Sequence, residues 1–224
     1  MDLLNSSEIL RTYSPVLLLT FIATWFGSCW IDKLYAQEQD SDLLSFPKQI
    51  VQRARFRKPL LFVLLVICIG KAWSVATGSQ LLYFVIAIAL LVFVTVTDFE
   101  QYIIFDFMLL PLAVAGFCYT LHMQLPITEH LVAALGGGFL FFVLTLLTKG
   151  AIGGGDIKLI AALGLWLGIR PLLSVIMYGF LTGGVAALFL LITKQKKRRD
   201  YFAYGPYFAL SGIGILLSWT HRLL

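Results

Sequence analysis

The chain has 224 residues, of which 59% are hydrophobic and only 13% are charged. A soluble domain of this length needs a polar shell around its core, and so few polar residues cannot build one. The formal net charge is +5, and the basic residues gather beside apolar runs, mainly at 48–58 and 194–199. This distribution is typical of membrane-protein loops rather than of a nucleic-acid reader. We therefore expect a single membrane-embedded domain over residues 1–224 and no nucleic-acid binding.

Eight apolar runs approach the length of about 20 residues that a helix needs to cross a bilayer. In chain order they are residues 14–31, 59–76, 80–97, 103–122, 129–148, 152–169, 171–193 and 202–220. The sixth is the weakest, because it opens on a glycine cluster and contains Asp156 and Lys158. The runs predict an all-α, polytopic membrane protein with about eight transmembrane helices.

One connection is long, residues 32–58, and it is acidic at its start and basic towards its end. It could fold as a short amphipathic helix on the membrane surface. It could equally be a plain solvated loop, and the sequence favours neither alternative.

Lys and Arg are unevenly divided between the two sides that these spans define. If the N-terminus lies outside, the inside loops hold 13 of the 17 basic residues and the outside ends hold four. Because basic residues concentrate in cytoplasmic loops, we expect both termini to lie outside and residues 32–58 to be cytoplasmic. The turns after the third and fifth spans then also face the cytoplasm.

Carboxylates occur at both of these cytoplasmic turns. Asp98, Glu100 and Asp106 surround the turn after the third span, and Asp156 ends the run 153–156, GGGD. Taken alone, Asp98 would be a helix-end residue and Asp156 a helix N-cap. A phosphate-binding loop is disfavoured, since the run lacks the G-x-x-x-x-G-K-[ST] spacing.

Asp98 and Asp156 on the same side of a membrane suggest an acid pair. Two close carboxylates do not readily both ionise, so one can keep a proton while the other stays charged. The charged group can draw a proton from a water that attacks a peptide carbonyl, and the protonated group can polarise that carbonyl. This chemistry requires no metal. The sequence has neither H-E-x-x-H nor G-x-S-x-G, so a zinc protease and a nucleophile elbow have no support.

The same residues resemble the bacterial prepilin peptidases, also called type IV leader peptidases. Gly153 to Asp156 match the G-x-G-D signature of membrane aspartyl proteases, within the similar longer segment 151–164, AIGGGDIKLIAALG. Asp98 and Asp106 keep the spacing of the family's D-x6-P-D segment, with Phe105 where proline is usual. Residues 203–210, around a Gly-Pro pair, also resemble a family segment.

The resemblance covers about residues 80–220 and implies roles for six residues. Asp98 and Asp156 would be catalytic. Supporting roles would fall to Asp106, Gly153, Gly155 and Lys158.

The resemblance also implies a substrate and a location. The substrate would be the basic leader of a type IV prepilin or of a type II secretion pseudopilin, cut at the cytoplasmic face of the bacterial inner membrane. Many family members also N-methylate the new N-terminus with S-adenosylmethionine, and many carry two C-x-x-C pairs in the first cytoplasmic loop. Residues 32–58 contain no cysteine, so we interpret them as a reduced methylation region and leave that activity open.

Two other functions stay open. A proton-coupled transporter or channel would also hold carboxylates within the membrane, although the chain shows no convincing internal repeat of the kind that transporters carry. A non-catalytic assembly factor would keep the fold without the activity. Neither the particular substrate nor the oligomeric state follows from the sequence.

Overall fold

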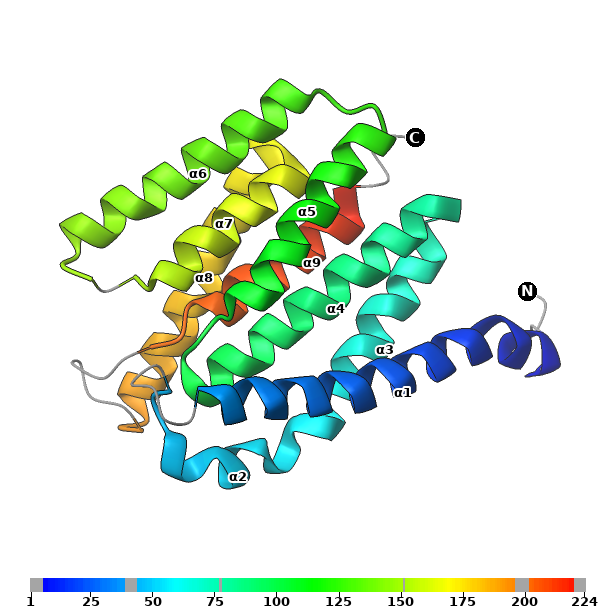
Figure 1. Ribbon diagram of the computed structural model, residues 1–224, viewed down its shortest axis with the longest axis horizontal. Helices are drawn as coiled ribbons and strands as arrows, with labels where there is room; N and C mark the ends of the chain where they lie inside the picture. The colour runs from blue at the N-terminus through cyan, green and yellow to red at the C-terminus, as the bar shows by residue number, and fades with distance from the viewer. Residues whose placement is uncertain (1–5, 39–43, 77, 151, 196–201, 220–224) are drawn as a thin grey trace.

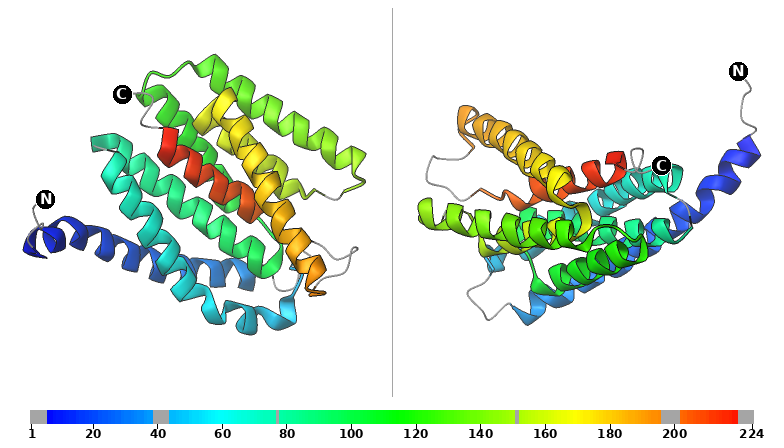
Figure 2. Two further views of the ribbon diagram at one scale, coloured as in Figure 1. Left: turned by 180° about the vertical axis from the view of Figure 1, so that it is seen from behind. Right: turned by 90° about the horizontal axis from the view of Figure 1, so that it is seen from above.

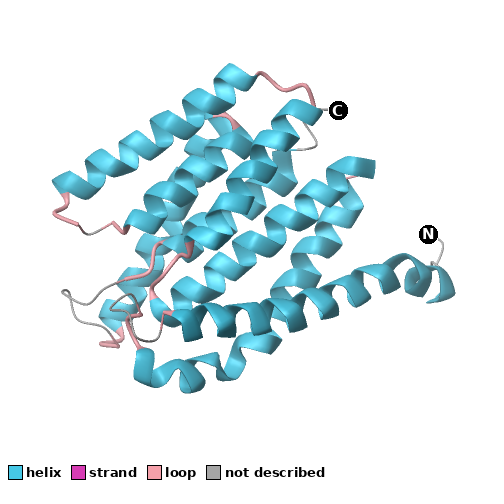
Figure 3. Cartoon of the chain, in the orientation of Figure 1, coloured by secondary structure: helices cyan, strands magenta, loops and turns pink. Residues whose placement is uncertain are grey.

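A computed structural model describes residues 6–38, 44–76, 78–150, 152–195 and 202–219. Every element in these ranges is a helix (Figures 1 and 3), which confirms the all-α prediction. The long helices are α1 (Ser6–Gln37), α3 (Arg57–Val75), α4 (Gly78–Gln101), α5 (Asp106–His122), α6 (Ile127–Leu147), α7 (Gly154–Leu167), α8 (Ile169–Ile192) and α9 (Gly205–Trp219). Each of them overlaps one of the eight predicted runs.

Five stretches of the described residues are helical, apolar and long enough to cross a bilayer. They are Ser14–Gln37, Ile50–Val75, Gly78–Gln101, Ile127–Leu147 and Ile169–Ile192. Helices α5 and α9 are apolar but shorter, and α7, the weakest of the predicted spans, has only 14 residues. The protein is therefore a multi-pass membrane protein, and the count of eight spans stays a prediction.

Two helices form the centre of the bundle. Helix α4 packs against α1, α3, α5 and α9, while α7 packs against α5, α6, α8 and α9. Consecutive long helices run in opposite directions (Figures 1 and 2), as short connections require. The end of α4 and the start of α7 therefore lie at the same end of the bundle. We call this the carboxylate end, because Asp98, Asp106 and Asp156 lie there.

Helix α6 packs closely against α7 because Gly164 of α7 lies in the contact. A Cβ on Gly164 would lie 2.5 Å from both the Cα and the N atoms of Ala134. Since backbone cannot move aside as a flexible side chain can, this position accepts only glycine without a shift of one helix.

The long connection is mostly helical where the structure describes it. Helix α1 continues to Gln37, and η1 (Pro47–Gln49), α2 (Ile50–Arg53) and η2 (Ala54–Phe56) lead directly into α3. Of the residues described, 47–56 form short helices that continue into α3, and their place at the membrane surface stays a prediction. Residues 39–43, which belong to the same connection, lie outside the described residues.

Candidate active site

The structure brings Asp98 and Asp156 together from two helices that are distant in the sequence. Asp98 lies in the last turn of α4 and Asp156 in the first turn of α7, and they are only 6% and 8% exposed. A Cβ on Gly205, the first residue of α9, would lie 2.5 Å from Oδ2 of Asp98 and 3.2 Å from Oδ1 of Asp156. The two carboxyl groups therefore flank the same glycine.

Backbone N–H groups orient both carboxyl groups. Oδ2 of Asp156 accepts a hydrogen bond from the N–H of Gly153 at 3.2 Å, and the Asp156 N–H donates to the Gly153 carbonyl at 3.1 Å. This reciprocal pair is the usual way for an acidic residue to close the first turn of a helix. Asp98 accepts a hydrogen bond from the backbone N–H of Gly205.

One carboxyl oxygen has no hydrogen-bond partner among the residues that the structure describes. Oδ1 of Asp156, the oxygen that faces Gly205, is buried and accepts no hydrogen bond from any residue that the structure describes. Buried carboxyl oxygens normally have a partner. An oxygen of this kind, beside the glycine that a second carboxyl group also contacts, is suited to hold a water or a substrate atom.

The glycines of the GGGD run differ in what the structure requires of them. A Cβ on Gly155 would lie 2.9 Å from Cβ of Ile104, so Gly155 lets α7 approach the segment between α4 and α5. Gly153 has an ordinary φ of −72°, and a Cβ there would make only a normal contact of 3.5 Å with Asp156. The close approach of Ile104 thus requires a residue without a side chain at Gly155, whereas at Gly153 it is the backbone N–H that contacts Asp156.

Asp106 and Lys158 form an ion pair at the rim of the site. Nζ of Lys158 lies 2.7 Å from each carboxyl oxygen of Asp106, and the two side chains are 57% and 67% exposed. An exposed pair contributes little to stability, about 0–1 kcal/mol. Its effect is positional, because it joins the start of α5 to the first turns of α7.

A cavity of about 640 Å³ opens beside the two aspartates. Asp98, Asp156, Asp106 and Lys158 all line it, together with Glu38 and Tyr204. The cavity therefore gathers the two predicted catalytic residues and the ion pair that two of the predicted supporting residues form. Among the described residues, no group of three or more His, Cys, Asp or Glu side chains could hold a metal ion.

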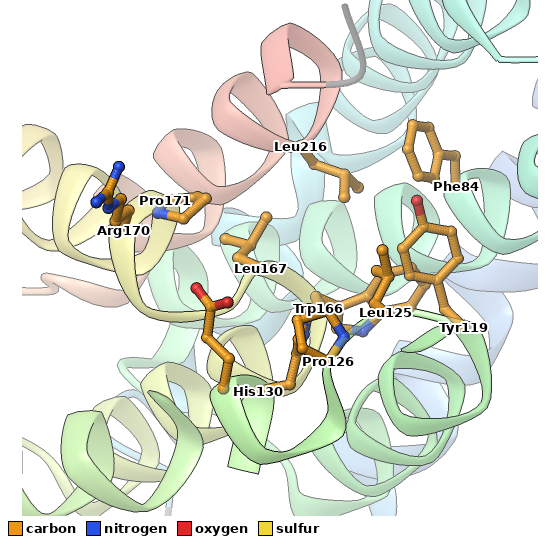
Figure 4. Close-up of a pocket in the computed structure, with 11 residues that line it drawn as sticks. Phe84, Tyr119, Leu125, Pro126, His130, Trp166, Leu167, Arg170, Pro171 and Leu216 are labelled. Carbon is orange, nitrogen blue, oxygen red and sulfur yellow. The ribbon is translucent and has the colours of Figure 1, made fainter. Parts of the chain in front are cut away.

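A smaller cavity of about 250 Å³ lies at the opposite end of the bundle, where α7 ends (Figure 4). Tyr119, His130, Trp166 and Arg170 are among its lining residues. The Nδ1–H of His130 donates to the Leu165 carbonyl at 2.8 Å, which explains this histidine as a helix-packing residue. None of the predicted site residues lines this cavity.

A buried ion-pair network behind Asp98 was not predicted from the sequence. Nε of Arg57 lies 3.0 Å from each carboxyl oxygen of Glu100, and the Arg57 side chain is only 1% exposed. The Tyr35 hydroxyl donates to Glu100 at 3.0 Å, and Asp32 also pairs with Arg57. The one sequence signal was a basic residue at the head of an apolar run, which costs free energy unless it is paired.

Two further sets of hydrogen bonds hold the same end of α4. Arg53 donates to the carbonyl of Glu100 at 2.6 Å, which satisfies an acceptor that a helix end leaves free. The Gln101 side chain accepts from the N–H of Phe46 at 2.9 Å and donates to its carbonyl at 3.3 Å. We call Arg53, Arg57, Glu100 and Gln101 the α4 clamp. It ties residues 44–58 to the helical turn that carries Asp98.

Phe105 occupies the position where the family usually has proline. Its φ is −77° and its ψ is 134°, and proline prefers a φ near −65°. The backbone thus has the conformation that proline would impose. The ring of Phe105 is buried and lies 5.9 Å from that of Tyr35, so here the side chain also contributes to packing against α1.

The fold and the site define a multi-pass helical membrane protein with a buried pair of aspartates at one end of its bundle. Residues 84–188 match the type IV leader peptidase family. Together with the relatives described next, this match shows that the chain belongs to that family.

Three relatives are prepilin leader peptidase/N-methyltransferases. The Neisseria gonorrhoeae protein is 35% identical over 163 residues, which are 70% of this chain and 56% of the relative. The Dickeya chrysanthemi protein is 30% identical over 68% of this chain and 57% of its own. The Xanthomonas campestris protein is 29% identical over 71% and 57%, respectively. The chain thus spans somewhat more than half the length of these relatives. No solved structure matches it.

Proposed function

We propose that this protein is a membrane aspartyl endopeptidase that removes the basic leader of type IV prepilins or type II secretion pseudopilins. Asp98 and Asp156 are its catalytic pair. The observation that supports this most directly is that the two aspartates, from α4 and α7, flank Gly205 in a single cavity. The relatives, which are prepilin leader peptidase/N-methyltransferases, support the choice of substrate.

The proposed reaction uses one protonated and one charged aspartate. The charged carboxylate takes a proton from a water, and the resulting hydroxide attacks the carbonyl carbon of the scissile peptide bond. The protonated carboxyl group donates a hydrogen bond to the carbonyl oxygen and then supplies a proton to the leaving nitrogen. The N–H groups of Gly153 and Gly205 hold the two side chains in place during these steps.

The reaction takes place at the cytoplasmic face of the bacterial inner membrane. The carboxylate end carries most of the basic residues of the described chain, including Lys48, Arg53, Arg55, Lys149 and Lys194. Such a concentration is typical of the cytoplasmic side. Both termini would then lie outside, and the leader would reach the cavity from the cytoplasm.

Prepilin cleavage by the purified variants Asp98→Asn and Asp156→Asn tests the pair. Each variant should lose roughly 10²–10⁴-fold in rate, since an amide can neither take up nor give the proton. Glu129→Gln is the control, because Glu129 lines the cavity at the opposite end of the bundle and its loss should leave cleavage unchanged. Full activity of either aspartate variant would refute the pairing.

A proton-coupled transporter is the alternative function. It would show proton flux in reconstituted vesicles without any cleavage of prepilin. Family membership favours the peptidase, and flux without cleavage would reverse that preference.

Methylation of the new N-terminus is a second activity that the relatives' names suggest. The described part of residues 32–58 shows no feature that points to a site for S-adenosylmethionine. Arg53 and Arg57 are bound to α4, and only Glu38 and Ser45 of this segment line the cavity. We therefore derive no methylation step. Transfer of a labelled methyl group from S-adenosylmethionine to cleaved pilin would decide whether the activity is present.

A further inference from the structure

Besides the two cavities, an apolar groove of about 630 Å³ runs along α7 between α5 and α6. Its walls include Leu110 of α5 and Leu135 of α6, whose side chains are 68% and 74% exposed. Its floor is made of short side chains, among them Ala113, Ala134 and Ala161. A floor of small residues lets the backbone of another helix approach closely.

The groove adjoins the cavity that contains the proposed catalytic pair. Asp106 and Lys158 line both the groove and the cavity that contains Asp98 and Asp156. The other lining residues of α7 extend from Ala161 to Leu165, so the groove runs for about 10 Å beyond Lys158, or two helical turns. At the far end, residues 123–126 join α5 to α6 (Figure 1). The end of the groove at Asp106 and Lys158 is therefore the one beside the cavity.

We infer that this groove binds an apolar, membrane-embedded helix of the substrate that adjoins the scissile bond, an inference that rests on the proposed peptidase function. The apolar groove and the polar cavity match the two parts of such a substrate, its apolar helix and its basic leader. The groove is apolar apart from Asp106 and Lys158, as a membrane-embedded helix requires. The cavity is rich in carboxylates, and it takes the scissile bond and the basic leader.

The continuity of groove and cavity is what selects this occupant over a lipid chain. A lipid could fill an apolar groove anywhere on the surface of the bundle. A helix seated between α5 and α6 would enter the cavity at the Asp106–Lys158 ion pair and place its first residues beside the aspartates. The groove thereby sets which peptide bond of the leader junction meets the catalytic pair.

The first test fills the groove. Ala113→Phe should lower kcat/KM for a complete prepilin by about tenfold or more, mainly through a higher KM, because it removes binding shared by ground and transition states. Val185→Phe is the matched control, since it adds a ring to a residue of α8 that is 65% exposed and outside the groove. It should cleave like the wild-type protein.

The second test does not depend on whether the filled variant folds. A photoreactive benzoylphenylalanine at Leu110, introduced into the Asp156→Asn variant, should crosslink to prepilin in membranes. The same group at Leu188 of α8, which is 58% exposed, should not.

The outcomes separate the two proposals. If the wild-type protein cleaves prepilin but Ala113→Phe cleaves it equally well, or if position 110 crosslinks only to lipid, the groove assignment is wrong and the peptidase assignment survives. If the wild-type protein cleaves no prepilin or pseudopilin, the proposed function itself fails.

Discussion

Gly205 brings the start of α9 against both aspartates, and its lack of a side chain leaves room for their carboxyl groups. A Cβ at this position would lie 2.5 Å from Oδ2 of Asp98 and 2.8 Å from Cδ1 of Ile104. The carboxyl group has little room to move away, because Asp98 is only 6% exposed.

Gly205→Ala should therefore displace Asp98 and lower kcat/KM for prepilin by roughly 100-fold, which is the effect of a shift of about 1 Å in a catalytic group. Cleavage assays on the purified variant measure this. Gly154→Ala is the control, because a Cβ there would meet nothing within 4 Å. If Gly205→Ala were fully active, the position of Asp98 would not depend on this contact.

The α4 clamp leads to a prediction about stability. Arg57→Ala should destabilise the fold by about 3–5 kcal/mol, because it leaves the buried Glu100 carboxylate without its partner. The Glu100 side chain is only 8% exposed. Thermal unfolding in detergent should show a lower Tm, and prepilin cleavage should fall with it.

Two comparisons check that the pairing of charges causes this effect. Arg55→Ala removes an exposed arginine of the same segment and should leave the Tm almost unchanged. The double variant Arg57→Met, Glu100→Leu removes both charges and should recover part of the lost stability. A double variant no more stable than Arg57→Ala would contradict this explanation.

At the scale of helices, the contact between α6 and α7 decides how the short α7 is held in place. Gly164→Ala would put a Cβ 2.5 Å from the Ala134 backbone, so the two helices must separate. We expect a loss of about 1–3 kcal/mol of stability, as for an overpacked core, visible as a lower Tm. Gly136→Ala on α6, where a Cβ meets nothing within 4 Å, should have no such effect. Equal Tm values for both variants would argue against close packing at Gly164.

The helices could be predicted from the sequence far better than their ends. Apolar runs locate the segments that lie within a bilayer. They do not mark where a helix ends when it continues beyond the bilayer. Helix α1 extends past the predicted boundary at residue 31 to Gln37. Its last turns contain Asp32 and Tyr35, which bind Arg57 and Glu100. This contact between distant segments has no local signature, so the pattern of apolar residues could not reveal it.

The candidate site, too, could be predicted only in part from the sequence. The GGGD run and the spacing of Asp98 and Asp106 marked the carboxylates, because both are local patterns. The resemblance of residues 203–210 pointed to the segment of Gly205 without giving it a role. Its role, like that of the α4 clamp, depends on which helices pack together, and a single sequence does not determine this.

For the whole molecule, the orientation in the membrane decides whether the cavity can meet a leader in the cytoplasm. Lys48 lies near the carboxylate end and Ser79, at the start of α4, near the other, and both are exposed. In a cysteine-free variant, Ser79→Cys should react with a membrane-impermeant maleimide on intact cells. Lys48→Cys should react only after the inner membrane is permeabilised.

The reverse labelling pattern would put the aspartates on the outer side, away from a basic leader that has not crossed the membrane. Labelling is decisive because it does not depend on activity. The basic residues favour the carboxylate end as the inner one, and the cavity opens at that same end. The distribution of charge and the proposed place of cleavage thus predict the same orientation in the membrane, and a single labelling experiment tests that orientation.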